Sequence, residues 1–523
     1  MTKISLFSIL CFLAFAGNPF FVLAVTAPVQ DVSPRAYYIS NGGDDKQTGS
    51  SDHPWKTLDR LKNLRLLPGD SVLFAGGQVF TGSLLIDSNS LGTADHPIFI
   101  GSYGKGQAKI DGGNGEALIL YKTEYVRVTH LRLAGSGRKQ RNTKNGFALL
   151  NSRFIQIADL DISGFQKSGL LIYTSQHIGV SGVVCHDNGS AGITVEGDSS
   201  KKDSRDIRIR HCRAENNPGD PTNLTNHSGN GIVVGHCTSV LIEYCSATNN
   251  GWDMPRIGNG PVGIWCYEAD SVTIQHCLSY KNKTSPGGAD GGGFDLDGGV
   301  TNSFLQYNLS YGNQGSGYCI FQYWGASPWY NNVVRYNISE NDGLVSDSRS
   351  GLYVWNSSND SSQFHDCLVY NNTVYNAREA AISFSETSAR YNFAFYNNIF
   401  VGRDSLIRGD KGKDIFLGND WWSIEKKFNA DKMNDFAGWA RRYNKEIRSG
   451  KLVGFNMNPR FKNPGNMRLT HFPDAASYDA YRIPSASVLR VHGIDLQQNA
   501  GIQTGGLDFN QHPAPARGVG ASF

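Results

Sequence analysis

Four acidic residues lie close together in the middle of the chain. Asp290, Asp295 and Asp297 fall within eight residues, and Glu268 precedes them by about one repeat. On an extended strand Asp295 and Asp297 would share a face, with their bases roughly 6.5–7 Å apart. Like charges at this distance require a cation, a shared proton or wide separation. Two chemistries follow: paired carboxylates that cleave a glycosidic bond, or carboxylates that bind Ca²⁺ and assist removal of a proton beside a uronate.

Aromatic residues surround these acids in neighbouring repeats. Several strands begin with glycine, and the second and fourth residues after that glycine are expected to point outward. Flat rings stack on the apolar face of a sugar, and a contiguous exposed patch of rings indicates a binding site. We predict that Asp295, Asp297 and Glu268 are catalytic. The predicted sugar-binding residues are Trp265, Tyr267, Phe321, Tyr353, Trp355 and Glu196. The alternative is that long loops cover these rings, which then form a small satellite core.

Two interleaved series of short strands must position these residues. One series alternates apolar and polar residues and ends in Asn or Cys, as in residues 272–277. The other begins with a small residue, at intervals between 23 residues (Gly146 to Gly169) and 39 residues (Gly192 to Gly231). Interleaved strands at variable spacing indicate a solenoid with loops of unequal length rather than a propeller. The turns would be satisfied by a stack of amides, from Asn308, Asn337, Asn372 and Asn398.

This pattern resembles the right-handed parallel β-helix proteins, a group that includes pectate lyases and polygalacturonases. The resemblance covers about residues 100–400 and implies an all-β fold, a right-handed parallel β-helix. It says nothing firm about the chemistry, because one fold hosts many functions.

The segment Asp290–Asp297 carries a more specific likeness. It resembles the calcium-binding run of the family nine polysaccharide lyases, which implies Ca²⁺ held by Asp290, Asp295 and Asp297. It is also similar to a stretch of the polygalacturonases, which are hydrolases. The sequence therefore keeps both a calcium-dependent lyase and a glycoside hydrolase open.

The chain departs from both families. Cys319 stands where those lyases place their catalytic lysine, and residues 315–318 replace the second acidic pair of the polygalacturonases. We therefore favour hydrolysis, which requires no cofactor, over calcium-assisted elimination. In the lyase alternative a base would come from a loop, with candidates Lys281, Lys283, His227 and Arg256.

The sequence divides into four segments. Residues 1–24 are typical of a signal peptide, with Lys3, an apolar stretch and a small residue at Ala24. Residues 36–112 are predicted to form an N-terminal cap leading into the β-helix, with a short helix near 55–64. Residues 113–420 are the predicted β-helix. Residues 421–523 are predicted to hold a helical insertion, spaced helically over 424–448, and a closing segment.

Composition limits the kinds of partner that the protein could bind. The 523 residues carry 49 Lys and Arg against 46 Asp and Glu, so no basic footprint points to nucleic acid. No later run is long and apolar enough to span a membrane. We expect an exported protein, extracellular or periplasmic, that acts as a monomer on a polysaccharide or oligosaccharide. The non-enzymatic alternative is a solenoid that binds glycans without cleaving them.

The cysteines recur at one place in the repeat. Cys212, Cys245 and Cys277 all end strands of the first series. Stacked there, they are expected to act as small buried fillers, with disulfides as the alternative in an exported chain.

Overall fold

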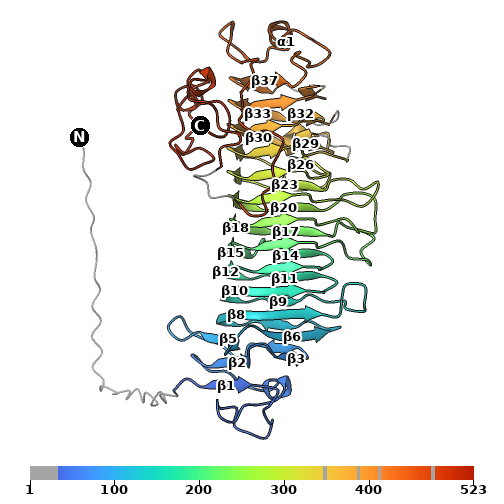
Figure 1. The fold of residues 1–523 in the computed structure, drawn as a ribbon, viewed down its shortest axis with the longest axis vertical. Helices are drawn as coiled ribbons and strands as arrows, with labels where there is room; N and C mark the ends of the chain where they lie inside the picture. The colour runs from blue at the N-terminus through green and yellow to red at the C-terminus, as the bar shows by residue number, and fades with distance from the viewer. Residues whose placement is uncertain (1–32, 346–349, 386–388, 404, 410–413, 473–477) are drawn as a thin grey trace, which may run out of the picture.

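The computed structural model describes residues 33–523 except 346–349, 386–388, 404, 410–413 and 473–477. The described chain winds into an elongated stack of coils, from β1 (Ala36–Ile39) at one end to β37 (Asp420–Ser423) at the other (Figure 1). Strands of successive coils pair in parallel. The predicted parallel β-helix is therefore confirmed.

One sheet contains twelve strands and is formed by the series that begins with a small residue. We call it the twelve-stranded sheet. Its strands are β4 (Leu84–Ile86), β7 (Leu118–Tyr121), β9 (Phe147–Leu150), β11 (Ser168–Tyr173), β14 (Ala191–Glu196), β17 (Asn230–Gly235), β20 (Val262–Tyr267), β23 (Gly292–Leu296), β26 (Tyr318–Gln322), β29 (Ser350–Asn356), β32 (Ala380–Phe384) and β35 (Ile407–Arg408).

The other large sheet has 25 strands in two rows, joined where the long strands β8 and β10 run through both. The first row is β1, β2 (Ser71–Ala75), β5 (Ile98–Tyr103), β8 (Glu124–Gly135), β10 (Arg153–Ser163), β12 (Gln176–Ser181), β15 (Ser204–Arg210), β18 (Cys237–Glu243), β21 (Asp270–Gln275), β24 (Phe304–Gln306), β27 (Asn332–Arg335), β30 (His365–Tyr370), β33 (Tyr391–Tyr396) and β36 (Ile415–Leu417). The second row is β3 (Val79–Thr81), β6 (Ala108–Gly113), β13 (Val184–His186), β16 (Arg213–Glu215), β19 (Ser246–Thr248), β22 (Leu278–Tyr280), β25 (Leu309–Tyr311), β28 (Ile338–Glu340), β31 (Thr373–Tyr375), β34 (Ile399–Gly402) and β37.

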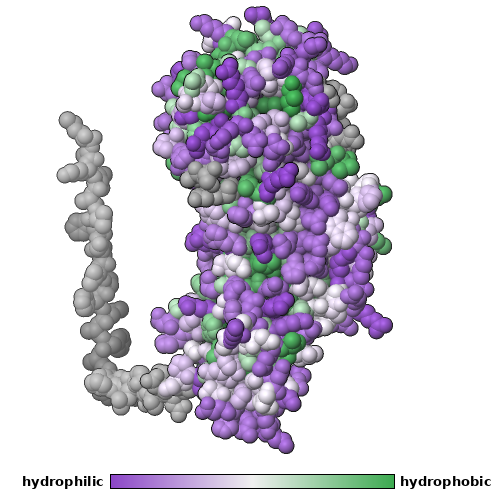
Figure 2. Space-filling view, in the orientation of Figure 1, coloured by the Kyte–Doolittle hydropathy of each residue, from purple (hydrophilic) through white to green (hydrophobic). Residues whose placement is uncertain are grey.

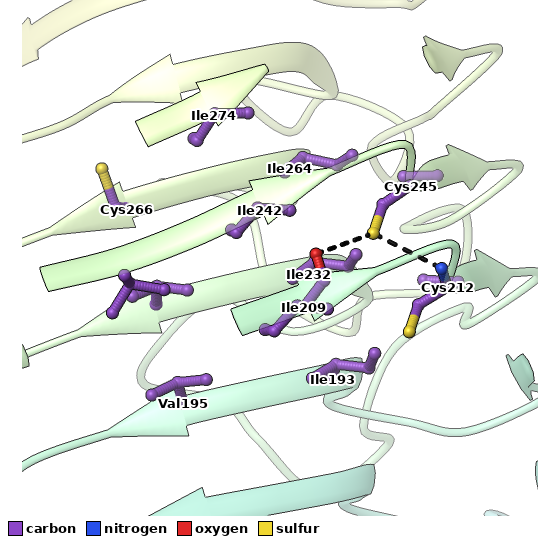
Figure 3. Close-up of a cluster of buried hydrophobic side chains, with 14 of the residues drawn as sticks. Ile193, Val195, Ile209, Cys212, Ile232, Ile242, Cys245, Ile264, Cys266 and Ile274 are labelled. Atoms are coloured by element: carbon purple, nitrogen blue, oxygen red, sulfur yellow. Dashed lines mark hydrogen bonds between the residues drawn. The ribbon is translucent and has the colours of Figure 1, made fainter. Parts of the chain in front are cut away.

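Columns of aliphatic side chains fill the space between the sheets (Figure 3). Strand pairing puts Ile193, Ile232 and Ile264 in register on the twelve-stranded sheet. Because side chains alternate along each strand, an apolar residue at the same position of every coil builds a continuous core.

The cysteines occupy the turns beside these columns. Cys212 donates its backbone N–H to Cys245 Sγ at 3.4 Å, as Figure 3 shows. All eight described cysteines are buried and free, so the prediction of buried fillers is confirmed. Burial raises the pKa of the Cys212 and Cys245 thiols, which keeps them protonated.

The predicted asparagine stack is present. Asn308, Asn337 and Asn372 each donate a backbone N–H to the amide oxygen of the next rung, at 2.9–3.0 Å, and the stack continues through Asn398 to Asn419. A second ladder, which was not predicted, runs through Asn188, Asn217, Asn250, Asn282 and Asn313. Both ladders satisfy buried turn groups that would otherwise lack partners.

The second ladder ends on a carboxyl group, Asp342. Asn313 donates to Asp342 Oδ1 from its backbone and its side chain, and Ser339 donates to Oδ2 at 2.7 Å. Burial raises the pKa of Asp342 to about 7. An asparagine fits this rung, because Asn313 itself donates to Ser310, the residue in register with Ser339, at 3.0 Å.

We expect Asp342→Asn to stabilise the protein at neutral and alkaline pH. The folded-state pKa lies above the unfolded value, so this group's contribution to stability is lost as pH rises from about 4 to about 7. The variant should gain up to about 4 kcal/mol above pH 7, at ~1.4 kcal/mol per pKa unit, and little at pH 4. Denaturant titrations at pH 4 and pH 8 measure this difference, with the exposed Asp52→Asn as control. An equal effect at both pH values would contradict the prediction.

The ends of the β-helix differ in detail from the predictions. Parallel pairing begins at β1, so residues 36–112 form the first coils, with the 3-10 helix η1 (Leu58–Leu61) capped by Thr57. Near the other end, α1 (Phe436–Tyr443) begins at the N-cap Asp435, so the helical part is much shorter than the predicted 424–448. The remaining short elements are η2 (Ser361–Gln363), β38 (Ile447–Arg448), β39 (Lys451–Leu452), η4 (Val488–Arg490) and α2 (Leu496–Ala500).

The closing segment lies along the side of the upper coils in Figure 1. Tyr481 and Phe509 pack with Leu278, Leu309 and Ile338, which belong to β22, β25 and β28. The predicted signal peptide, residues 1–24, lies outside the described residues. In the described part of the chain, no helix is long and apolar enough to cross a membrane.

Candidate active site

A pocket of about 490 Å³ opens on the twelve-stranded sheet over β20, β23, β26 and β29. Register explains its composition, because Trp265, Asp295, Cys319 and Tyr353 occupy matched positions of four successive strands. The structure thus brings together eight of the residues singled out from the sequence: Trp265, Tyr267, Asp290, Asp295, Asp297, Phe321, Tyr353 and Trp355.

The aromatic residues do not form the open, exposed face that was expected. Trp265 is 3% exposed and Phe321 is 6% exposed. Loop residues that include His227, Gly260 and Ala289 complete the walls of the pocket. The alternative of covered rings is therefore correct in part: Trp265 and Phe321 are buried, whereas Tyr267, Tyr353 and Trp355 stay partly exposed around a cavity.

Asp295 lies at the floor of this pocket on β23. Its side chain is buried, and its Oδ1 has no hydrogen-bond partner among the described residues. Burial, followed by the nearby charges of Asp297 and Asp290, raises the pKa of Asp295 well above its usual value. Burial and the neighbouring charges therefore favour the protonated form of Asp295.

Asp297 follows two residues later, in a more polar position. Burial raises the pKa of Asp297 to about 7, with Asp290 and Glu268 also raising it. A hydrogen bond from the Gly298 N–H, at 2.7 Å, favours the ionised form and limits the increase. The two neighbouring carboxyl groups thus differ in their affinity for a proton.

Asp290 completes the acidic group from the loop before β23. Its Oδ2 accepts a hydrogen bond from the Gly260 N–H at 2.6 Å, which ties this loop to the loop before β20. Ca²⁺ takes six to eight oxygen ligands, several from ionised carboxylates. Within the described residues, no group of three or more Asp, Glu, His or Cys lies close enough to hold a metal ion. The calcium site that the resemblance implied, on Asp290, Asp295 and Asp297, stays a prediction.

Glu268 does not line the pocket, contrary to its predicted catalytic role. Strand β20 ends at Tyr267, and Glu268 takes a left-handed conformation (φ 44°). This turns its carboxylate toward the next loop, where Oε1 accepts from the Ser327 N–H at 2.8 Å. The Cβ of any side chain added at Gly299 would lie 2.5 Å from Glu268 Oε2, so glycine is needed there.

Glu196 also lies behind the pocket rather than in its lining. It accepts a hydrogen bond from the Tyr267 hydroxyl at 2.7 Å and contacts His236 Nδ1 at 2.5 Å. Gly235 lies in register between Glu196 and Tyr267, and a Cβ there would lie 2.4 Å from the tyrosine ring. The predicted sugar-binding residue Glu196 therefore positions Tyr267, across a gap that only glycine leaves open.

His227 lines the pocket, whereas the sequence suggested it only as a substitute base. Its ring packs edge-on against Trp265, with centroids 4.8 Å apart, and its Nδ1 pairs with the Asn230 amide at 3.0 Å. The amide can donate to Nδ1, which places the ring proton on Nε2. Burial, and secondarily Arg256, lowers the pKa of His227 to about 4. His227 is therefore neutral at physiological pH.

Other lining residues gave no signal in the sequence. They come from loops and strand ends and are Asn226, Asn259, Gly260, Val262, Ala289 and Tyr323. The other basic candidates are absent from the lining: Lys281, Lys283 and Arg256.

The fold and this pocket define a right-handed parallel β-helix protein with an acidic, ring-lined cavity on one sheet. The chain belongs to the Pel9A-like right-handed β-helix family, whose model matches residues 37–398.

Relatives with known names include glycoside hydrolases and polysaccharide lyases. A lacto-N-biosidase from Bifidobacterium longum subsp. longum is 24% identical over 485 residues, covering 71% of this chain and 29% of its own length. This chain thus spans under a third of that relative.

Among solved structures, the GH136 lacto-N-biosidase of Eubacterium ramulus is 18% identical, with 74% of this chain and 67% of that chain covered and a TM-score of 0.40. A PL6 family alginate lyase is 15% identical, with 82% and 55% covered and a TM-score of 0.50. At this level of identity the likeness supports the fold alone.

Proposed function

We propose that this protein is a glycoside hydrolase that cleaves a polysaccharide or oligosaccharide in the pocket over β20, β23, β26 and β29. The observation that carries the proposal is a pair of carboxyl groups that line one pocket, Asp295 on β23 and Asp297 directly after its end, whose environments separate their proton affinities. Hydrolysis of a glycosidic bond needs one protonated and one ionised carboxyl group. The relative named lacto-N-biosidase supports a hydrolase.

The reaction assigns a different role to each aspartate. Asp295 donates its proton to the glycosidic oxygen, so the leaving sugar departs with a hydroxyl group. Asp297, ionised, acts on the anomeric carbon either as nucleophile or through a water molecule that it deprotonates. Water supplies the new hydroxyl group of the other product, and the proton lost from Asp295 is restored in the same cycle.

The rings of the pocket bind the sugar units beside the cleaved bond. Tyr353 and Trp355, which are partly exposed, supply flat apolar surfaces, and the Asn226 and Asn259 amides supply hydrogen-bonding groups for hydroxyls. A largely enclosed pocket suits a short stretch of glycan better than the side of a long chain.

A calcium-dependent lyase is the second candidate, and the register of Cys319 weighs against it. Cys319 lies beside Asp295, and its thiol is buried with a pKa raised well above the usual value. Such a thiol is a poor base, because the thiolate is the reactive form.

The test is to incubate the protein with pectic, algal, hemicellulosic and host-type glycans, with and without a calcium chelator, and to analyse products by mass spectrometry. Fragments that have gained water and are insensitive to the chelator support the hydrolase. Unsaturated fragments that vanish with the chelator would replace it with the lyase. Binding without any product would leave a glycan-binding solenoid.

The pH dependence of the reaction gives a sharper prediction. The active form needs Asp297 ionised and Asp295 protonated, so kcat/KM should rise as pH increases through about 7. The two groups interact, so this midpoint belongs to the pair.

Asp290→Asn should move the rise in kcat/KM to lower pH. The charge of Asp290 raises the pKa of Asp297, and asparagine removes that charge while its oxygen can still accept from Gly260. The matched control is Asp52→Asn, an exposed residue in the first coils. If kcat/KM of Asp290→Asn rises at the same pH as that of wild type, Asp297 does not control this rise.

A further inference from the structure

A second concave surface lies far from the pocket, on the first row of the 25-stranded sheet. It has a volume of about 670 Å³ and spans β8, β10, β12 and β15, with Ala94 and Pro97 at one rim. We call it the arginine groove. Its other lining residues are Tyr125, Arg127, Phe154, Gln156, His177, Ile178, Gly179, Val180, Ser181, Asp206, Arg208 and Arg210. Figure 2 shows that hydrophilic side chains dominate the face of the molecule in that view.

Positive charge in this groove is not neutralised by the protein itself. Arg127 and Arg208 are exposed, and neither forms an ion pair among the described residues. Arg210 pairs with Glu243 at 2.6 Å, outside the groove lining. The carboxylate within the groove, Asp206, contacts His177 Nδ1 at 2.7 Å. Two guanidinium groups therefore remain available to an anion.

Strand register gives the groove its shape. Arg127, Gln156, Gly179 and Arg208 occupy matched positions of four successive strands. With strands about 4.8 Å apart, the two arginines stand about 14 Å apart at their Cα atoms. Gly179 has no side chain, and the Gln156 amide lies over it, with its oxygen 2.2 Å from where a Cβ would be. The groove therefore has a cation at each end and a low floor between them that carries the Gln156 amide.

The aromatic residues of the groove argue against a nucleic acid. Tyr125, Phe154 and His177 are stacked on one another, with ring centroids 4.6 Å apart and planes within 5°. Single-stranded nucleic acids bind through bases that stack on free aromatic faces. Here the middle ring, Phe154, has both faces covered by its neighbours and cannot stack on a base. The groove offers charge, an amide and a hydroxyl group, which suit a sugar chain.

We propose that the arginine groove binds a linear anionic glycan, carrying uronate or sulfate groups, along the axis of the β-helix. Arg127 and Arg208 pair with two acidic groups of the chain, and guanidinium groups suit carboxylate and sulfate oxygens in a bidentate geometry. Gln156 and Ser181 bind hydroxyls of the sugar between them. The site is separate from the proposed active site and serves to hold the chain on the protein.

The test measures binding of the full-length protein to polygalacturonate, a carrageenan, neutral amylose and a single-stranded DNA oligonucleotide by affinity electrophoresis. We expect Arg127→Ala/Arg208→Ala to weaken binding to an anionic glycan at least tenfold and to leave amylose unaffected. Stronger binding of polygalacturonate identifies uronate as the ligand, and stronger binding of carrageenan identifies sulfate. The control Arg441→Ala/Arg442→Ala removes the same charge from exposed positions of α1 at the other end of the molecule.

A second variant distinguishes binding in the groove from attraction by the overall charge of the protein. Gly179→Gln fills the floor without changing net charge, and the clash it meets is with the flexible end of Gln156. It should also weaken binding at least tenfold. Failure of the wild-type protein to bind either anionic glycan would overturn the proposal. Binding of an anionic glycan by both groove variants as tightly as by wild type would also overturn it, as would DNA binding that the two variants weaken to the same extent.

The groove and the active site are distinguished by measuring glycan binding in an active-site variant and turnover in a groove variant. Asp295→Asn should retain wild-type binding to the anionic glycan, and Arg127→Ala/Arg208→Ala should retain wild-type turnover of a short neutral oligosaccharide substrate. Loss of groove binding in Asp295→Asn would mean that the pocket, and not the groove, holds the chain.

Discussion

Replacing Asp295 by asparagine is expected to lower kcat by about 10² to 10⁴, the contribution typical of a general acid. Asparagine has nearly the same shape but cannot transfer a proton to the glycosidic oxygen. Asp295 is buried, and its Oδ1 has no hydrogen-bond partner, so the change removes little from the fold. The effect should therefore appear in kcat with no loss of thermal stability, since burial of this carboxyl group opposes folding at neutral pH.

A matched variant outside the pocket makes this prediction sharper. Glu268→Gln keeps an oxygen for the Ser327 N–H and removes only a charge behind the pocket. Because Glu268 raises the pKa of Asp297, the comparison is made above pH 7, where Asp297 is ionised in both proteins, and there we expect kcat to stay within a few fold of wild type. Initial rates on the best glycan of the panel measure both variants. If Glu268→Gln is as damaged as Asp295→Asn, or Asp295→Asn keeps wild-type turnover, the assignment of the acid is wrong.

The β-helix could be predicted because its constraints are local and repeat in every coil. Period-two alternation sets which side chains enter the core, and a buried Asn at each turn bonds to the coils on either side of it. The same logic placed Trp265, Asp295 and Tyr353 in one pocket, since matched positions of stacked coils are neighbours in space. Strand register alone was therefore enough to predict that part of the site.

The rest of the site could not be predicted, because it depends on single backbone dihedral angles and on the paths of loops. Glu268 left the predicted catalytic group because one left-handed residue ends the alternation of β20. His227 and Gly260 reach the pocket from loops whose path has no repeat to constrain it. Likewise, the apolar residues Phe428 and Met433 have helical spacing but precede the Asp435 cap, so they lie outside α1.

The asparagine ladder carries the largest effect we expect on stability. Asn337 is fully buried and makes four ladder bonds. Its oxygen accepts from the backbone and side chain of Asn308, and its amide donates to Leu305 O at 2.7 Å and to Asn372 at 3.0 Å. Leucine has a similar volume but no polar atoms, so Asn337→Leu leaves buried donors and acceptors without partners. Each such group costs about 1–3 kcal/mol.

We therefore expect Asn337→Leu to lower the free energy of unfolding by about 3–6 kcal/mol, which a denaturant titration of wild type and variant measures. The matched control is Asn434→Leu, the same substitution at an exposed residue that precedes α1, and it should change stability by less than about 0.5 kcal/mol. Because each rung bonds to the rungs on both sides, the damage should spread, and protease cleavage in native buffer should increase around coils β24–β30. A midpoint equal to that of the control would mean that water or rearranged amides replace the lost bonds, and that the core columns alone hold the coils together.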